Sequence, residues 1–105
     1  MPEEVYYEDV FTTIGVSAIR LAPAKSFSMQ VKGIGAIPQA WTVVLEGSLD
    51  GLFFTTLMQH TKTDGDGKIV DLVPPTLVRF TRIRVASLNL GAASNIKVVI
   101  FGIML

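Results

Sequence analysis

One stretch carries the clearest structural signal in this sequence: Trp41-Thr42-Val43-Val44-Leu45-Glu46-Gly47-Ser48-Leu49-Asp50-Gly51. Its first residues alternate, because Trp41, Val43 and Leu45 share one face of an extended strand. The following Ser48-Leu49-Asp50-Gly51 is typical of a tight turn, since glycine tolerates positive φ and an aspartate side chain can bond the turn backbone. A second, largely apolar run, residues 53–58, comes directly after the turn. The stretch therefore predicts a β-hairpin.

Strand signals recur along the rest of the chain. Turn residues separate them about every 8 to 12 residues, and no window shows a helical stripe with caps. Such spacing is typical of an all-β sandwich or barrel. We therefore expect an antiparallel, jelly-roll-like β-sandwich of seven or eight strands. Besides the hairpin, the runs that alternate or are rich in β-branched residues are 10–14, 16–21, 26–32, 69–73, 77–88 and 96–105.

The predicted core follows from the alternation within these runs. Successive side chains of a strand point to opposite faces, so the more apolar face is expected to be the buried one. In residues 77–88 this rule places Phe80 on the face of Arg82 and Arg84, unless a β-bulge resets the phase. The residues expected in the core are Phe27, Met29, Val31, Trp41, Val43, Leu45, Ile83 and Val85.

Length and composition exclude several classes of protein. The chain has 105 residues, enough for one domain with its own core, and it contains no cysteine, which excludes disulfides and thiolate chemistry. Nine basic and nine acidic residues give a net charge of zero, which argues against nucleic acid as a partner because such binding needs a basic surface. The N-terminus is acidic and no apolar run approaches the about 20 residues that span a bilayer, so we expect neither a signal peptide nor a membrane partner.

The chain is expected to consist of an N-terminal arm, residues 1–9, and a single β-sandwich domain, residues 10–105. The arm combines four acidic residues with Tyr6 and Tyr7, and it shows neither clean alternation nor helix caps. Two interpretations of it remain open. It is either a frayed terminus or an extension that docks on a neighbouring molecule through its two tyrosines.

The apolar content of the chain indicates assembly. Hydrophobic residues make up 50% of the sequence and charged residues 17%, whereas charged residues usually make up about 25%. A domain of this size has much surface for its volume, and exposed apolar patches normally mark interaction surfaces. We therefore expect the chain to bury part of its surface against copies of itself or a larger assembly. A well-filled core is the alternative explanation.

The last two strands give a second indication of assembly. Residues 99–101 and 103–105 make the last strand apolar on both faces, and such strands are usually covered on both sides. Arg82 and Arg84 point the same way, either to clamp acidic residues of the arm across a subunit boundary or to lay their stems over apolar surface. The residues expected at an oligomer or coat interface are Tyr6, Tyr7, Arg82, Arg84, Val99, Phe101 and Ile103.

Candidate catalytic and metal-binding residues are few. Asp64 and Asp66 lack the further glutamate that calcium loops usually supply, so a solvated turn explains them better. His60 is the sole histidine and cannot by itself make a zinc site or a triad, so we expect an ordinary hydrogen bond at a strand end. Trp41 could stack on a sugar ring, but its phase with Val43 favours the core. We therefore expect no enzyme activity, no metal and no cofactor.

The hairpin resembles a signature of two related groups of β-sandwich. Residues 41–51, followed by Phe54-Thr55-Thr56-Leu57, are similar to the strand, Ser-x-Asp-Gly turn and aromatic-Thr-x-Leu strand of the discoidin or coagulation-factor type C group of galactose-binding-like jelly rolls. Residues 80–85 resemble a later strand of that group, and residues 96–102 resemble its closing strand. The other group, the small β-sandwich proteins of tailed-phage virions, carries much the same hairpin phrase. The resemblance covers residues 26–104.

The differences from the extracellular discoidin domains favour the virion group. The chain is shorter, lacks the cysteines that tie the termini of those domains, and shows no obvious exposed aromatic residue in its loops. The resemblance implies a non-enzymatic virion protein, made in the host cytoplasm and forming a homotrimer. Its expected role is capsid decoration, or cement, with the major capsid protein or another virion protein as partner. The alternative is a carbohydrate-binding or adhesion module of a phage tail, neck or fibre.

Overall fold

The structure is a computed structural model that describes residues 4–72 and 78–104. The ends of three predicted strands, at residues 73, 77 and 105, lie outside the described residues, as do residues 1–3 of the predicted arm. Within the described ranges every strand pairing is antiparallel. The elements are β1 (Glu4–Phe11), β2 (Gly15–Val16), β3 (Arg20–Leu21), β4 (Ala24–Ile34), β5 (Ala40–Ser48), β6 (Thr55–Thr61), the short 3-10 helix η1 (Lys62–Asp64), β7 (Ile69–Leu72), β8 (Phe80–Asn89) and β9 (Asn95–Met104).

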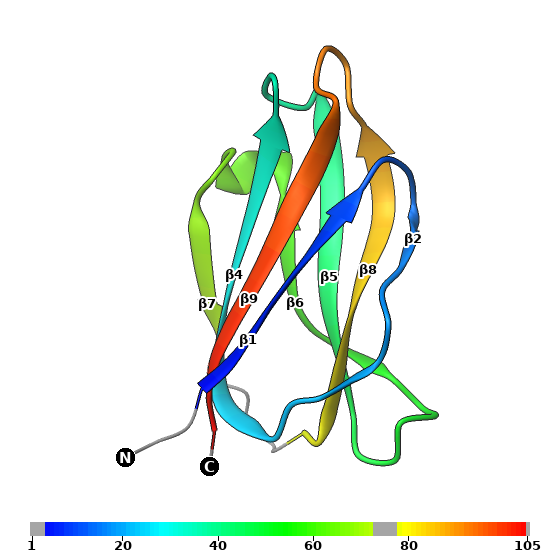
Figure 1. Cartoon of the computed structure of the whole chain (residues 1–105), viewed down its shortest axis with the longest axis vertical. Coiled ribbons are helices and arrows are strands. Elements are labelled where there is room, and N and C mark those ends of the chain that lie inside the picture. Colours follow the sequence, from blue (N-terminus) through cyan, green and yellow to red (C-terminus); the bar gives the residue numbers. More distant parts are fainter. Residues whose placement is uncertain (1–3, 73–77, 105) are drawn as a thin grey trace.

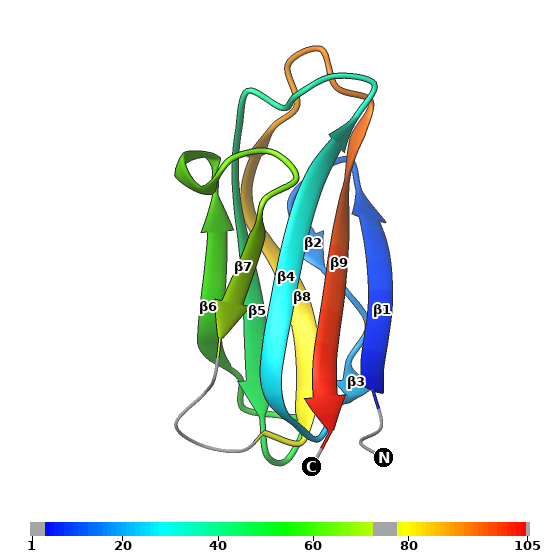
Figure 2. The same ribbon diagram turned by 90° about the vertical axis from the view of Figure 1, so that its left-hand side faces the viewer.

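Two antiparallel sheets face each other and confirm the predicted β-sandwich (Figure 1). The first sheet has the order β1-β9-β4-β7, and the second has the order β2-β8-β5-β6, with β3 also paired to β8. Each connection passes from one sheet to the other, except β2 to β3 and the β5–β6 hairpin. This is the connectivity of a jelly roll if β2 and β3 count as one interrupted edge strand. Figure 2 shows the side of the molecule where the edge strands β6 and β7 lie.

The core lies between the two sheets, and all eight residues expected there are buried. Among the described strands, three β-bulges interrupt the ladders, at Lys25, Leu57 and Ala86. Because the bulge at Ala86 comes after the first half of β8, it does not change the phase of Phe80, which stays on the face of Arg82 and Arg84 as the alternation predicts.

The predicted arm is corrected by the structure, because most of it is a strand. Residues 4–9 belong to β1, which pairs with β9 along its whole length and forms one edge of the first sheet. Val5 and Tyr7 point into the core, while Glu4, Tyr6 and Glu8 face outward. The alternation continues with Asp9 and Phe11. Because the inward Asp9 is polar, the alternation of apolar residues does not reveal this strand in the sequence.

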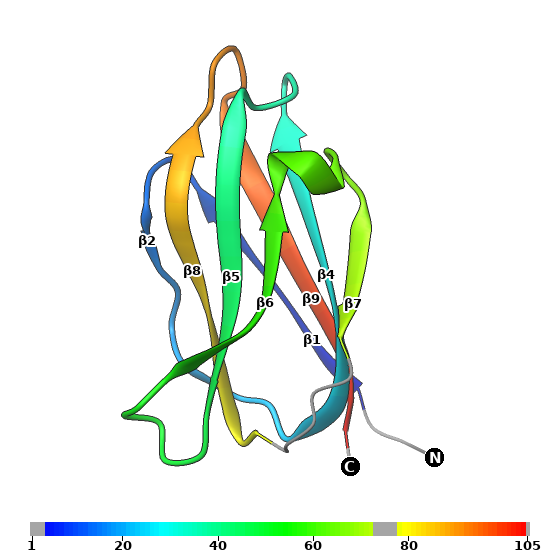
Figure 3. The ribbon, with the colours of Figure 1, turned by 180° about the vertical axis from the view of Figure 1, so that it is seen from behind.

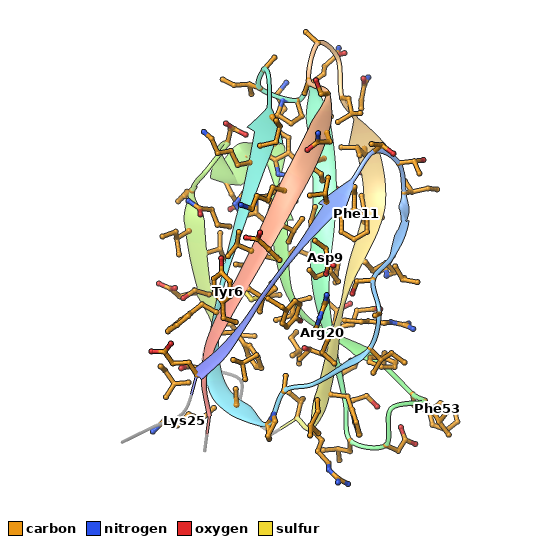
Figure 4. All side chains as sticks on the ribbon, viewed as in Figure 1. Tyr6, Asp9, Phe11, Arg20, Lys25 and Phe53 are labelled. Carbon is orange, nitrogen blue, oxygen red and sulfur yellow. The ribbon has the colours of Figure 1, made fainter. Side chains whose placement is uncertain are left out.

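Tyr7 ties β1 to the second sheet and therefore belongs to the core, not to the predicted interface. Its hydroxyl shares a hydrogen bond of 2.7 Å with the Thr81 hydroxyl of β8. The guanidinium of Arg20 lies over the Tyr7 ring at 4.2 Å and forms two hydrogen bonds, of 2.6 and 2.9 Å, with the carboxylate of Asp9. Figure 4 shows Asp9 and Arg20 near each other. Burial raises the pKa of Tyr7 to about 12. The arrangement fixes the edge strand β1 on the sandwich.

Candidate functional site

The outer face of the first sheet carries an apolar stripe. On β9, the inward residues alternate with Val99, Phe101 and Ile103, which are partly exposed. The register of β1 on β9 sets Tyr6 opposite Phe101, and Tyr6 is 60% exposed. Figure 4 shows Tyr6 on this face of the molecule. We call Tyr6, Val99, Phe101 and Ile103 the apolar stripe; the structure thus places four of the seven predicted interface residues on one surface.

A charged pair borders the apolar stripe. The Lys97 ammonium lies 3.1 Å from the Glu8 carboxylate, which also accepts a hydrogen bond of 3.0 Å from the Tyr6 hydroxyl. The hydrogen bond from Lys97, followed by that from Tyr6, lowers the pKa of Glu8, while the bond to Glu8 raises the pKa of Tyr6. Both groups stay in their ordinary charge states near neutral pH, so this border adds polarity to the surface and no acid–base chemistry.

Two shallow hollows flank Phe101 on the same face. The larger has a volume of about 250 Å³ and opens between β9, the start of β4 and the end of β7. The smaller, of about 90 Å³, lies further along β9 and β4. Ser28 lines both hollows and donates a hydrogen bond to Asp71. The larger hollow, which we call the Phe101 hollow, is lined mainly by Phe27, Leu72, Phe101 and Ile103, with Ser26, Ser28 and Asp71 as its polar residues.

Figure 3 shows the second sheet from its outer side, with β8, β5 and β6 toward the viewer. The centre of this outer face holds an ion cluster. The Glu46 carboxylate of β5 accepts hydrogen bonds from the Nε atoms of Arg82, at 2.8 Å, and Arg84, at 3.1 Å. The Phe54 ring lies 4.1 Å from the Arg82 guanidinium. Burial raises the pKa of Glu46, but the hydrogen bonds and charges of the two arginines outweigh burial and lower it overall. Both arginines thus bond Glu46 of their own chain and not the acidic residues of β1; an interface role for them stays a prediction.

The β5–β6 loop exposes large apolar side chains. Phe53 is 82% exposed and Leu52 is 79% exposed, and Leu49 is exposed beside them. Figure 4 shows Phe53 pointing away from the molecule at its lower right. The expectation that the loops expose no aromatic residue is therefore wrong. The sequence predicts Phe53 in the second arm of the hairpin, but that strand begins only at Thr55.

Local hydrogen bonds hold this loop in its exposed conformation. The Asp50 carboxylate accepts hydrogen bonds from the backbone N–H groups of Leu52, at 2.8 Å, and Phe53, at 3.0 Å. The Ser48 hydroxyl accepts from the N–H of Gly51 at 3.0 Å and donates to Asp50 at 2.9 Å. Bonds to the Phe53 and Leu52 backbone lower the pKa of Asp50. These bonds extend the turn past Gly51. The Ser-x-Asp spacing in the sequence was the signal that could have revealed this longer turn.

Trp41 and His60 form a buried pair that serves the core. The indole N–H of Trp41 donates to His60 Nδ1 at 3.1 Å, and His60 Nε2 lies 2.8 Å from the carbonyl oxygen of Lys68. Because Nδ1 accepts, Nε2 carries the proton and donates to Lys68, which makes the imidazole neutral. His60 thus makes ordinary hydrogen bonds near the end of β6. Trp41 is buried and presents no ring face to a sugar.

The aspartates of the β6–β7 connection satisfy backbone groups. Asp64 accepts from the N–H of Thr61 at 2.7 Å and caps η1, and Asp66 accepts from the N–H of Gly33 at 2.7 Å. Across residues 4–72 and 78–104, no group of three or more His, Asp or Glu side chains is placed to hold a metal ion. Asp64 therefore caps η1 locally, whereas Asp66 ties the β6–β7 connection to β4.

The comparisons with known proteins identify the fold. No protein-family model matches the chain, and no curated protein sequence matches it. The crystal structure of the SPBc2 prophage-derived protein YomS is similar, with a TM-score of 0.70 and 11% identity over 98% of this chain and 95% of that one. The chain thus shares its β-sandwich fold with a prophage-derived protein.

Two further solved structures align over most of the chain at lower similarity. The crystal structure of PirA gives a TM-score of 0.41 at 13% identity, covering 97% of this chain and 92% of that one. A Bacillus endospore appendage described as a disulfide-linked pilus gives 0.37 at 9% identity, covering 100% and 92%. Both scores are too low to support an argument. In the described part of the chain, no helix is long and apolar enough to cross a membrane.

Proposed function

We propose that this protein is a non-enzymatic structural component of a tailed-phage virion that assembles with copies of itself, as a trimer, and decorates the capsid. The observation that carries the proposal is the apolar stripe on the outer face of the first sheet. Val99, Phe101 and Ile103 lie on a central strand of that sheet and remain partly exposed. An apolar surface of this kind is stabilised when a partner covers it.

The polar groups of the molecule support a structural role. The sole histidine is engaged in the core, the aspartates of the β6–β7 connection cap backbone groups, and Glu46 is neutralised by two arginines of its own chain. Each of these groups satisfies an internal partner, which is what a scaffold requires. The prophage origin of YomS, which has the same fold, agrees with a phage source.

A decoration protein needs only contact area to act. A molecule bound across the seam between two coat subunits adds buried surface to both of them, so separating the subunits then requires breaking the added contacts as well.

Virions of the phage that encodes the chain provide the test. Gradient-purified particles should contain the protein in fixed proportion to the major capsid protein, measured by quantitative mass spectrometry. Particles that lack the gene should release their DNA at a lower temperature than wild-type particles. Detection of the protein only in the infected cell, and never in particles, would contradict the proposal. Detection in isolated tails alone would place it in the tail instead of on the capsid.

One observation supports the carbohydrate-binding alternative. It predicts an exposed aromatic side chain at a loop tip, and Phe53 occupies such a position. Saturable binding on a glycan array that is lost in Phe53→Ser, with the fold intact, would favour this alternative. Trp41, its original candidate, is buried.

A further inference from the structure

We infer that the β5–β6 loop of one copy inserts Phe53 into the Phe101 hollow of a second copy, so that the chain assembles head to tail. This inference rests on the proposed self-assembly and goes further by naming both sides of the contact. The Phe101 hollow lies beside the apolar stripe, so the loop would cover the surface that the proposed function leaves to a partner.

The loop is built as an insertion element. Its three large apolar side chains are exposed, while the adjacent Phe54 turns back onto Arg82 of its own chain. The hydrogen bonds from the backbone of Leu52 and Phe53 to Asp50 fix the loop before any partner arrives. A loop that is already ordered loses little conformational entropy on binding, which favours association.

The Phe101 hollow fits an aromatic side chain. A cavity of about 150 Å³ lined by leucine, isoleucine and phenylalanine is large enough for benzene in a well-studied protein. The Phe101 hollow has a volume of about 250 Å³, and its lining is mainly apolar. A phenyl ring therefore fits there with room for neighbouring atoms, and it would pack against Phe101 and Ile103.

The position of the two elements excludes contact within one molecule. The loop joins β5 and β6 of the second sheet, whereas the hollow opens on the outer face of the first sheet. In Figure 1 the loop projects at the lower right, and β4 and β7, which line the hollow, lie on the left. The loop and the hollow thus lie near the same end of the molecule but on opposite sides.

The positions of the loop and the hollow determine what kind of assembly the contact can form. A contact between two different surfaces of identical chains is heterologous, and it closes into a ring when the rotation between neighbours allows. Because the loop and the hollow lie at the same end, neighbours can stand side by side, as in the proposed trimer. A typical interface buries about 800 Å² per partner and one aromatic side chain about 150–250 Å², so the apolar stripe must contribute area next to the loop.

The test is sedimentation velocity of the whole chain and of two variants. Phe53→Ser removes the inserted ring, and Ser28→Arg fills the hollow from an outward position. Each variant should raise the dissociation constant of self-association about tenfold to a hundredfold, as expected when a phenylalanine side chain is no longer buried. Leu52→Ser is a second loop variant with the same expected direction. Circular dichroism and the urea midpoint establish that each variant is folded.

Two matched controls isolate the contact. Ile37→Ser removes another exposed apolar side chain, in the loop between β4 and β5, and Ser87→Arg makes the same change as Ser28→Arg at an exposed position of β8. Both controls should assemble like the wild-type chain. An equimolar mixture of Phe53→Ser and Ser28→Arg should form a one-to-one dimer, because one variant keeps the hollow and the other keeps the loop.

The outcomes separate this inference from the proposed function. If the wild-type chain assembles but the loop and hollow variants assemble equally well, the named contact is wrong while self-assembly stands. If the variants dissociate but their mixture forms no dimer, the loop and the hollow do not bind each other. If Phe53→Ser leaves self-association unchanged but weakens binding to capsids, the loop docks on the coat protein instead. A strictly monomeric wild-type chain would overturn both proposals.

Discussion

The outer faces of the two sheets differ in the side chains that lie at their centres. The second sheet fills its centre with Glu46, which bonds Arg82 and Arg84, and Phe54 lies over Arg82. The first sheet leaves Val99, Phe101 and Ile103 partly exposed beside two hollows. At the centre of the second sheet the polar groups are bonded within the chain, whereas the central strand β9 of the first sheet leaves apolar groups partly exposed. This difference is the basis of our proposal that the first sheet contacts a partner.

The largest expected effect distinguishes the two sides of β9. Ile100 is fully buried, so Ile100→Ala should lower the free energy of unfolding by about 2–5 kcal/mol because it leaves a cavity. Its neighbour Phe101 faces outward, so Phe101→Ser should cost the isolated chain about 1 kcal/mol or less. Urea denaturation of dilute samples measures both values. Equal losses would show that Phe101 is needed for the fold itself.

The second prediction concerns the ion cluster of the second sheet. Glu46→Ala leaves Arg82 and Arg84 side by side without their shared carboxylate. We expect a loss of about 2 kcal/mol, below the range for a fully buried pair, because the arginine side chains are 28% and 38% exposed. Gln59→Ala, an exposed change on the neighbouring strand β6, is the control and should cost little. If the two variants unfold at the same urea concentration, the cluster contributes nothing to stability.

The third prediction uses the pH dependence of the same cluster. The folded pKa of Glu46 lies below its unfolded value, so its contribution to stability is fully present above the unfolded pKa and is lost as the pH falls through the folded pKa. The wild-type chain should therefore lose more stability in acid than Glu46→Gln, measured by urea midpoints from neutral pH downward. Parallel curves for the two proteins would contradict the assignment.

The fourth and smallest prediction tests the anchor that holds β1 beside the apolar stripe. Tyr7→Phe removes the hydrogen bond to Thr81 and should cost about 1 kcal/mol. Because the folded pKa of Tyr7 is raised to about 12, its contribution is present below the unfolded pKa and is lost as the pH rises through the folded pKa. Tyr7→Phe should thus flatten the alkaline loss of stability. An unchanged alkaline curve would mean that Tyr7 ionises without cost.

The fold could be predicted from the sequence where apolar and polar residues alternate strictly. Phe27, Met29 and Val31 in β4 and Trp41, Val43 and Leu45 in β5 follow the period of two, and all are buried. The strand β1 could not be found in this way. Its inward position at Asp9 is stabilised by two hydrogen bonds from Arg20, which lies beyond the end of the strand in sequence. Such compensation is not visible in a local pattern.

The candidate site was predicted in part, for a related reason. The apolar stripe follows from β9 being apolar on both faces, which is a property of sequence alone. The exposed Phe53 does not, because Asp50 lengthens the turn and delays the start of β6. The partner of Arg82 and Arg84 was also missed, since Glu46 meets them only through the pairing of β5 with β8. Turn chemistry and strand register decide these contacts.

Sedimentation equilibrium of the wild-type chain beside Phe101→Ser tests most directly whether the first sheet is covered by other copies. We expect the average mass of the wild-type chain to rise above that of one chain as its concentration increases through the micromolar range. Phe101→Ser should stay close to the mass of one chain over the same range. A wild-type chain that remains monomeric at high micromolar concentration, or a variant that assembles equally well, would contradict the account.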